Sequence, residues 1–292
     1  MNIAIIGRKF NENFVEYCQE LFKILEDAEC KVIIYQPFYR FLKTYVKLPD
    51  SYKNTFMRTD ELLNQDLVLT IGGDGTFLEA TTLVRDSNIP IAGINSGRLG
   101  FLADISKEDI KSALADIFDE NYKIRELNLL EISTEGDLFG DLNFALNELA
   151  ISKRDSSSMI TIHAYLNGEF LNSYWADGLI IATATGSTAY SLSTGGPILH
   201  PDSQNFVISP IAPHNLTVRP LVIPDSMDIK LKVDARGGKY LASLDSRGRV
   251  IDEQITISIK KASFSIQTLL RNHQSYYDTL RNKLMWGIDK RN

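Results

Sequence analysis

A run of glycines around one acid, Gly72-Gly73-Asp74-Gly75-Thr76, is the segment whose residue types could do chemistry. Glycine lets the chain turn sharply and brings bare backbone close to a ligand. Backbone N–H groups at the start of a helix that follows such a turn favour phosphate groups. Asp74 is the one acidic residue among these glycines. The run therefore predicts a phosphate-binding turn that carries a single carboxylate.

Regular elements on both sides must hold this turn. Residues 66–71 are a short apolar run with β-branched residues, which predicts a buried strand. Residues 76–84 have helical spacing, and Thr76 is a suitable helix cap. In an open α/β sheet such a turn lies at the carboxyl end of its strand, where ligands bind. The alternative is that Asp74-Gly75 is only a hairpin turn, but the residues after it do not alternate as a strand would.

A second cluster of small and polar residues lies at 177–197. A buried strand, Leu179–Ala182, leads into a turn that is rich in hydroxyl groups and glycine. Small side chains let a flat ligand approach, and hydroxyl and free N–H groups supply hydrogen bonds. The alternative is a tight turn of serines and threonines with a purely structural role.

Composition restricts the classes of protein. The chain has 292 residues, of which 44% are hydrophobic and 23% charged, so it can bury one large core or two ordinary ones. Its net charge of −6 argues against a nucleic-acid partner, because no basic surplus neutralises the phosphates of a duplex. Cys18 and Cys30 match no paired metal or redox spacing. No apolar stretch approaches about 18 residues and the start is no signal peptide, so we expect a cytoplasmic protein with no membrane partner.

The first part of the chain alternates strands and helices. Its predicted strands are 3–6, 31–35, 66–71 and 90–94, and its predicted helices are 14–25, 76–84 and 106–118. This order predicts a doubly wound α/β domain with a parallel sheet. Residues 36–58 are ambiguous between an irregular helix and a covering loop.

Beyond about residue 122 the pattern changes to closely spaced strands separated by turn residues. Helical spacing nearly disappears there and returns only in a predicted helix at 276–285. We therefore expect two domains. The α/β domain comprises residues 1–121 together with the tail at about 270–292, and the strand-rich domain comprises residues 122–269.

Together, these segments resemble the bacterial NAD kinase family. The matching segments are Gly72–Thr76, Gly93–Leu102, Asn147-Glu148, Asp177-Gly178, Thr185–Ser191 and Gly195–Pro197. They occur in the family's order and span roughly residues 1 to 270. The Gly-Gly-Asp-Gly segment also resembles lipid kinases and phosphofructokinases, whereas the Thr-Gly-Ser-Thr-Ala-Tyr-Ser segment is specific.

The resemblance implies both the fold and the reaction. A nucleotide-binding α/β domain would be followed by an NAD-binding domain of β-sandwich type. The enzyme would transfer the γ-phosphoryl group of ATP to the 2′-hydroxyl of the adenosine ribose of NAD, giving NADP. Mg²⁺ or another divalent cation would arrive with ATP, and the protein would be a homo-oligomer, either a dimer or a tetramer.

Roles for individual residues follow from the same resemblance. Asp74 would be the general base, with Gly73 and Gly75 beside the substrate, and Asn147 and Glu148 would bond ribose hydroxyls. The remaining candidates are Asp177 at the nicotinamide end and Thr185, Thr188, Ala189, Tyr190 and Ser193 along the ligand pocket.

Some positions leave alternatives open. Ala184 stands where the family commonly has proline, and the family's Asp-Gly-Gln pattern is blurred at 245–249, so no site residue is assigned there. Asp177 could instead bind backbone N–H groups. Arg98 is open between phosphate binding and a salt bridge.

The chemistry of the residues supports the assignment. A ribose hydroxyl is a poor nucleophile and needs a positioned base, which a carboxylate in a glycine turn can supply. Phosphoryl transfer otherwise needs positioning and charge neutralisation, and Mg²⁺ typically uses only one or two protein carboxylates. Glu148 lies inside an apolar run, where a buried acid needs a partner. The chain also lacks a Gly-x-Gly-x-x-Gly turn after a strand, so NAD would be a substrate and not a hydride carrier.

Two other functions are compatible with part of this pattern. A lipid or sphingoid-base kinase would need an apolar acceptor pocket, which the polar Asn147-Glu148 segment disfavours. A non-catalytic nucleotide-binding regulatory protein would not need the acid at Asp74.

Overall fold

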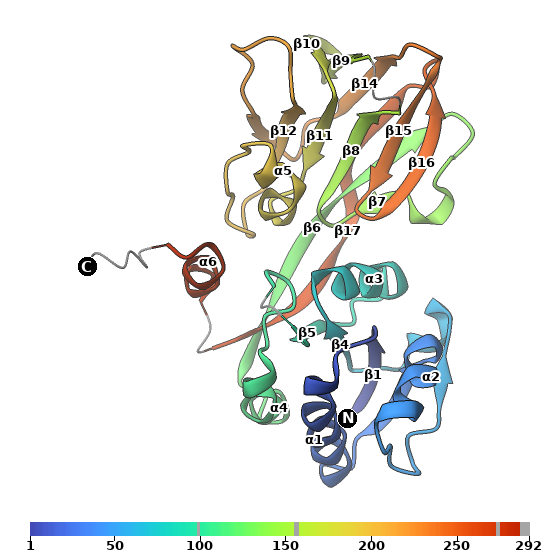
Figure 1. Ribbon diagram of the computed structural model, residues 1–292, viewed down its shortest axis with the longest axis vertical. Coiled ribbons are helices and arrows are strands. Elements are labelled where there is room, and N and C mark those ends of the chain that lie inside the picture. Colours follow the sequence, from blue (N-terminus) through green and yellow to red (C-terminus); the bar gives the residue numbers. More distant parts are fainter. Residues whose placement is uncertain (98–99, 155–157, 273–274, 287–292) are drawn as a thin grey trace. The chain divides into compact units, whose positions relative to one another are not determined.

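The chain divides into two units in the computed structural model (Figure 1). Unit 1 comprises Met1–Glu126 and Ile266–Asn292, and unit 2 comprises Leu127–Ser265. Residues 1–97, 100–154, 158–272 and 275–286 are described by the structure. Each unit has a hydrophobic core of its own.

Unit 1 is built on a parallel sheet of five strands in the order β5-β4-β1-β2-β3. These strands are β1 (Asn2–Gly7), β2 (Lys31–Tyr35), β3 (Thr55–Phe56), β4 (Leu67–Gly72) and β5 (Ile91–Asn95). Every residue of β4 and β5 is buried. Burial on both faces is typical of a parallel sheet, whose crossover helices cover it on both sides.

The helices of unit 1 follow the apolar spacing of the sequence. They are α1 (Val15–Asp27), α2 (Gln36–Tyr45), α3 (Asp74–Val84), α4 (Ile110–Phe118) and α6 (Tyr276–Leu284). Helix α2 resolves part of the ambiguous segment 36–58, and its start is favoured by Pro37, whose fixed φ suits the first helical turn. Cys18 of α1 and Cys30 before β2 are buried free thiols.

The strand order of unit 1 reverses beside β1. The chain runs from β1 outward to β2 and β3, then returns to place β4 on the other side of β1 and β5 beyond it. In open α/β sheets ligands bind outside the carboxyl ends of the strands at such a switch point. The strand ends concerned are Gly7 of β1, which is paired with Ile71, and Gly72 of β4.

Unit 2 packs two mainly antiparallel sheets face to face. One sheet contains β10-β9-β14-β17, with β6 beside β17 and β7 beside β6, and the other has the order β13-β12-β11-β8-β15-β16. The strands are β6 (Tyr122–Thr134), β7 (Phe144–Ala145), β8 (Glu148–Lys153), β9 (Ile160–Leu166), β10 (Glu169–Ala176), β11 (Gly178–Ala182), β12 (Asn205–Ile211), β13 (Leu221–Pro224), β14 (Ile229–Asp234), β15 (Lys239–Leu244), β16 (Arg247–Asp252) and β17 (Ile257–Arg271). A short helix, α5 (Tyr190–Ser193), follows β11.

An apolar core joins the two sheets of unit 2. It contains Ile162 and Leu231 from the first sheet and Ile181 and Leu244 from the second. Side chains from two inner faces that share one core define a β-sandwich. The predicted fold class, an α/β domain followed by a strand-rich sandwich, is therefore confirmed.

Candidate active site

The glycine turn of unit 1 joins β4 directly to α3 (Figure 1). The predicted cap at Thr76 is wrong, because the helix already begins at Asp74 and Gly73 is its N-cap. The Thr76 side chain instead lies against Gly72, where an added Cβ would approach it closer than 3.0 Å. Gly73 and Gly75 are exposed. The N–H groups of Thr76 and Phe77 donate to the Gly73 carbonyl, which leaves those of Asp74 and Gly75 for a ligand at this helix start.

The Asp74 carboxylate is fixed by the loop that follows β5. The backbone N–H of Phe101 donates to Oδ2 at 3.0 Å, and those of Leu102 and Ala103 donate to Oδ1 at 3.0 Å each. A carboxylate oxygen has about two lone pairs, so these bonds fill Oδ1 and leave one position on Oδ2. The acid is thus held in one orientation and can still accept one proton or hydrogen bond.

Gly100 and Asn95 shape this loop. A Cβ on Gly100 would overlap the Asp74 carboxylate, so only glycine allows the two to touch. Asn95 is 2% exposed, and its Oδ1 accepts a hydrogen bond from the N–H of Gly97 at 2.7 Å. The two glycine-rich segments that the sequence shows separately therefore form one assembly. Arg98, between these glycines, lies outside the described residues.

Two glycines of this loop provide a matched test of the contact. We expect Gly100→Ala to lower the free energy of unfolding by about 1–3 kcal/mol, because its methyl group displaces the Asp74 carboxylate. Gly97→Ala should stay within about 0.5 kcal/mol of the wild type, because a Cβ there meets nothing closer than Asn95 Oδ1 at 4.0 Å. Urea denaturation of both variants measures the difference, and equal losses would contradict the observed contact.

Arg8 is a candidate that the sequence reasoning missed. It follows β1 at the switch point, and its Nε lies 2.8 Å from Glu79 Oε2 on α3. A Cβ on Gly75 would lie 3.8 Å from a guanidinium nitrogen of Arg8, so this cation lies beside the start of α3. The available signal was its position directly after the first strand of a parallel sheet.

In unit 2 the segment Asn147-Glu148 packs against the hydroxyl-rich turn. The backbone N–H of Thr183 donates to the Asn147 carbonyl at 2.8 Å, and the Thr183 hydroxyl donates to the Leu146 carbonyl. A Cβ on Gly186 would overlap the Asn147 carbonyl. Two segments that are distant in sequence are thus in backbone contact.

Glu148 is a buried acid with an unsatisfied oxygen. Its side chain is 8% exposed, and its Oε2 has no hydrogen-bond partner among the described residues. The pKa of Glu148 is raised to about 7, chiefly by burial and secondly by the neighbouring Asp245, while the hydrogen bond from the backbone N–H of Tyr190 acts in the opposite direction. Buried polar atoms are normally hydrogen-bonded, so an orphaned carboxylate oxygen indicates a missing ligand.

The hydroxyl-rich turn has an inner and an outer side. Ser187 and Ser191 are buried, and their hydroxyl groups bond the Ala184 carbonyl at 2.7 Å and Ser209 at 3.0 Å. The predicted candidates are distributed differently: Thr185 is buried, Thr188 and Ala189 are half-buried, and Tyr190 and Ser193 are exposed. The inner side forms hydrogen bonds within the protein, as in the structural alternative, while the outer side carries exposed and half-buried side chains.

Asp177 lies at the other end of the same strand pair. Gly178 pairs with Ser152 at this end of β11, and Ala182 pairs with Glu148 at the far end. Four residue steps of an antiparallel strand separate these ends by about 14 Å. The Asp177 carboxylate forms a salt bridge with Lys153 at 2.6 Å. One ligand that contacts both Asp177 and Glu148 must therefore be long.

The structure thus divides the predicted residues between the units. Asp74, Gly73 and Gly75 belong to unit 1, and all the other candidates belong to unit 2.

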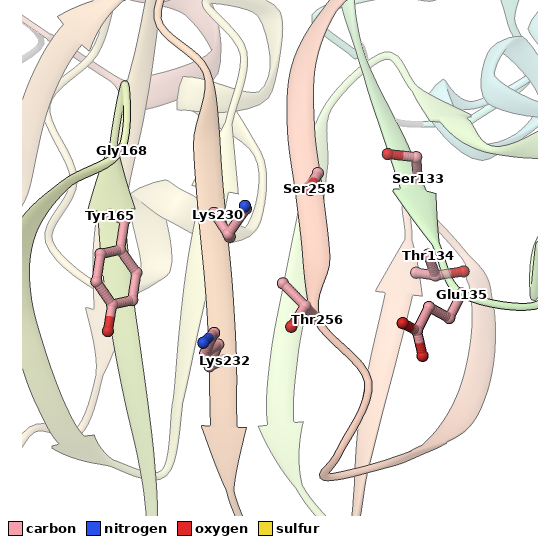
Figure 2. A pocket seen from close by; sticks show the side chains of 9 residues that line it. All are labelled: Ser133, Thr134, Glu135, Tyr165, Gly168, Lys230, Lys232, Thr256 and Ser258. Carbon is pink, nitrogen blue, oxygen red and sulfur yellow. The ribbon is translucent and has the colours of Figure 1, made fainter.

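A cavity of about 640 Å³ elsewhere in unit 2 contains none of the predicted site residues. Figure 2 shows that Lys230 and Lys232 of β14 line this cavity beside Tyr165 of β9.

Across the described ranges no group of three or more histidine, cysteine or acidic side chains is placed to hold a metal ion. In the same ranges, no helix is long and apolar enough to cross a bilayer.

Comparison with known families gives the class of the protein. The ATP-NAD kinase N-terminal domain matches residues 3–122, and the ATP-NAD kinase C-terminal domain matches residues 146–270. The chain is therefore an enzyme of the kinase class. It belongs to the NAD kinase family.

Individual NAD kinases are similar in sequence to this chain over their full length. The chain is 48% identical to an NAD kinase of Cytophaga hutchinsonii over 292 residues and 47% identical to one of Flavobacterium psychrophilum over 294 residues, covering 100% of each chain in both cases. Its fold is similar to yeast NADH kinase complexed with NADH, with a TM-score of 0.85, 24% identity and coverage of 99% of this chain and 89% of that one. It is also similar to an Archaeoglobus fulgidus NAD kinase in complex with ATP, with a TM-score of 0.74, 24% identity and coverage of 97% and 99%.

Proposed function

We propose that the chain transfers the γ-phosphoryl group of ATP to the 2′-hydroxyl of the adenosine ribose of NAD, with Asp74 as the general base. Membership of the NAD kinase family gives ATP and NAD as the substrates. The observation that carries the role of Asp74 is its fixed carboxylate, which keeps one free position on Oδ2 at the start of α3. No finding favours a lipid acceptor or a non-catalytic role.

In unit 1, charge neutralisation would come from two neighbouring features. The start of α3 carries free N–H groups and the positive end of the helix dipole, which attract phosphate. Arg8 adds a guanidinium that can bind phosphate oxygens in a bidentate manner. Its salt bridge with Glu79 holds the arginine beside Gly75 before the nucleotide arrives.

In unit 2, the candidates would bind NAD. The unsatisfied Oε2 of Glu148 supports bonds from ribose hydroxyls to Glu148 and its neighbour Asn147. Asp177 would contact the nicotinamide end, and its separation from Glu148 suits a dinucleotide. The outer side of the turn would line the pocket with Thr188, Ala189, Tyr190 and Ser193, and the buried Thr185 would line it from within the turn.

A divalent cation is required by kinases that use ATP, and Mg²⁺ is the ion we propose. Mg²⁺ is usually held by substrate phosphates with only one or two protein carboxylates. Asp74, at the start of α3, is the carboxylate beside the proposed phosphate site that could join this arrangement. When bound with ATP the ion would neutralise phosphate charge.

We also propose a homo-oligomer, either a dimer or a tetramer. Phe170 and Trp175 of β10 are 55% and 52% exposed, and exposed aromatic side chains are enriched at protein interfaces. Sedimentation equilibrium at several concentrations tests this, and a monomer throughout would reject it.

A coupled assay tests the function itself. The protein is incubated with ATP, Mg²⁺ and NAD, and NADP is detected with a dehydrogenase that accepts only NADP. We expect NADP to form only when all three are present. Absence of NADP, combined with phosphorylation of a lipid or sphingoid-base acceptor in a parallel assay, would identify the alternative kinase.

We expect Glu148→Gln to weaken NAD binding by about 1–2 kcal/mol, or roughly 5- to 30-fold, because charge-assisted hydrogen bonds to ribose hydroxyls are lost. Titration calorimetry at pH 8 measures the dissociation constant. Glu169→Gln, on the exposed start of β10, is the matched control and should bind NAD normally. An unchanged constant in folded Glu148→Gln would remove Glu148 from the site.

The same variant should be more stable than the wild type at high pH. The pKa of Glu148 is raised from 4.5 to about 7 in the folded protein, so ionisation opposes folding increasingly from pH 4.5 up to pH 7. Glutamine removes this cost, and the gain in unfolding free energy should reach about 2–3 kcal/mol above pH 7 relative to acidic pH. Denaturation of both proteins at pH 5 and pH 8.5 checks this difference.

A further inference from the structure

We propose that Asp245 is a positioning residue for NAD, which holds the backbone of Asn147 and Glu148 in place and controls the charge of Glu148. This inference rests on the proposed role of these two residues in NAD binding. The sequence reasoning assigned no site residue to the segment 245–249.

The contacts of Asp245 converge on the site segment. Its carboxylate accepts backbone N–H bonds from Leu146 at 3.1 Å, Asn147 at 2.8 Å and Glu148 at 3.2 Å. Its own backbone N–H donates to the Glu148 carbonyl at 3.0 Å. The side chain is 3% exposed. One buried carboxylate therefore fixes three consecutive residues, of which two are proposed to bind ribose.

Arg247 holds the residues that precede Asn147 and Glu148 in the chain. Its guanidinium lies 3.7 Å from Asp245 Oδ2 and donates to the carbonyls of Leu142, at 2.6 Å, and Phe144. It also lies over the Phe144 ring, 5.3 Å from the centroid. The turn between β15 and β16 thus holds residues 142–148 through two side chains.

Burying the Asp245 carboxylate carries a large desolvation cost. Removing a charge from water costs several kcal/mol unless hydrogen bonds and a counter-charge compensate. Asp245 has both, yet burial still raises its pKa above the ordinary value. An amide has only one acceptor oxygen and could not accept from all three N–H groups, so this position requires a carboxylate and places its charge beside Glu148.

The charge acts on Glu148. Asp245 acts on Glu148 from the β15–β16 turn, and Arg247 lies 3.7 Å from Asp245. The backbone N–H of Tyr190 in α5 donates a hydrogen bond to Glu148. On β8 itself, Lys153 is paired with Asp177 at the far end of the strand. Repulsion by Asp245 thus adds to burial in favouring the neutral form of Glu148. An NAD ribose that donates hydrogen bonds favours the carboxylate, so binding would be coupled to loss of this proton.

The experiment compares Asp245→Asn with the wild type in NAD titrations from pH 5.5 to 8.5. Wild-type affinity should rise through about pH 7 as Glu148 ionises. In Asp245→Asn the midpoint of this rise should move to lower pH, because the repelling charge is gone while the burial of Glu148 remains. At pH 8 the affinity of Asp245→Asn for NAD should still be roughly tenfold weaker than that of the wild type. The reason is that an amide nitrogen replaces the oxygen that accepts the hydrogen bond from the Leu146 N–H. KM for NAD should rise accordingly, while kcat changes less than about threefold because Asp74 is untouched.

Asp225→Asn is the matched control. Asp225 is also buried in unit 2, where it pairs with Lys261 at 3.0 Å and bonds Asn128 at 3.0 Å. It should lose stability yet keep the wild-type pH midpoint for NAD. An unshifted midpoint in Asp245→Asn, or the same shift in Asp225→Asn, overturns the proposal. If wild-type affinity is independent of pH, or Glu148→Gln binds normally, the proposed NAD site fails instead.

Should Asp245→Asn fail to fold, Arg247→Lys replaces it as the test. Lysine keeps a positive charge beside Asp245 but loses the planar bonds to Leu142 and Phe144. The expected result is weaker NAD binding with the midpoint unchanged within about half a pH unit. Wild-type affinity in this variant would show that the turn does not position the site.

Discussion

Asp74→Asn should lower turnover roughly 10²–10⁴-fold, which is the usual contribution of a positioned general base. Asparagine keeps the size and polarity of the side chain but cannot take the proton of the 2′-hydroxyl. NAD affinity should change far less, because the amide can still form a hydrogen bond with that hydroxyl. A loose transition state would bring the loss toward the lower end, since proton removal then lags behind bond breaking. Steady-state kinetics and NAD titration on one preparation measure both quantities.

The contacts of Asp74 add a structural effect that must be separated from catalysis. The amide oxygen can keep the bonds from Leu102 and Ala103, but the amide nitrogen then faces the N–H of Phe101. We therefore expect Asp74→Asn to lose about 1–2 kcal/mol of unfolding free energy. Asn95→Ala is the control, because it loosens the same loop by removing the side-chain bonds to Gly97 and Ala103 and keeps the Asp74 carboxylate.

Asn95→Ala should lose stability with less than about tenfold loss of turnover. If both variants lose activity equally, loop order and not proton transfer explains the effect. Near wild-type turnover in Asp74→Asn would show that the carboxylate only holds the loop.

Local patterns predicted the framework of this protein. The run before Gly72 and the helical spacing after it are separated by a few residues, and strand, turn and helix follow in the structure. The change of pattern near residue 122 likewise reflects the passage from alternating elements into strands. Such features depend on neighbours in the sequence, so spacing alone reveals them.

Contacts between distant residues were beyond the reach of these patterns. The N–H donors to Asp74 lie 27 to 29 residues away, and Leu146 lies 99 residues from Asp245. No periodicity connects a carboxylate with the backbone of a remote loop. The same limit explains why Arg8 was missed, since its proximity to Gly75 depends on the strand order.

Local propensity also gave one wrong detail. Threonine is a good helix cap, but α3 begins two residues before Thr76, with Gly73 as its cap. The acid at the first helical position interacts favourably with the helix dipole, and the loop at 101–103 holds it there. Tertiary contacts thus outweigh the capping preference of a single residue.

Gly186→Ala should weaken NAD binding about 10²-fold or more, and Gly186→Val should abolish it, because a displacement of about 1 Å in a binding group can cost this much. The reason is the approach of two backbones. Gly186 lies in a 3-10 turn (Thr185–Thr188), and a Cβ there would overlap the Asn147 carbonyl. Any side chain must therefore push the turn away from the Asn147-Glu148 segment.

The displacement would break several bonds together. The N–H of Gly186 donates to the Thr183 hydroxyl at 3.0 Å, and that hydroxyl donates to the Leu146 carbonyl. Moving Gly186 loosens this chain and shifts the predicted ligand contacts at Thr185 and Thr188 together with Asn147. Both sides of the proposed ribose site are thus disturbed by one methyl group.

Gly248→Ala is the matched control in the same unit, because a Cβ there meets nothing within 4 Å. Calorimetric titration with NAD and a thermal scan are performed on all three variants. We expect Gly248→Ala to match the wild type, and the Gly186 variants to keep a cooperative transition because the sandwich core lies in other residues. Normal NAD binding by Gly186→Val would show that the turn has only a structural role and that NAD contacts other residues.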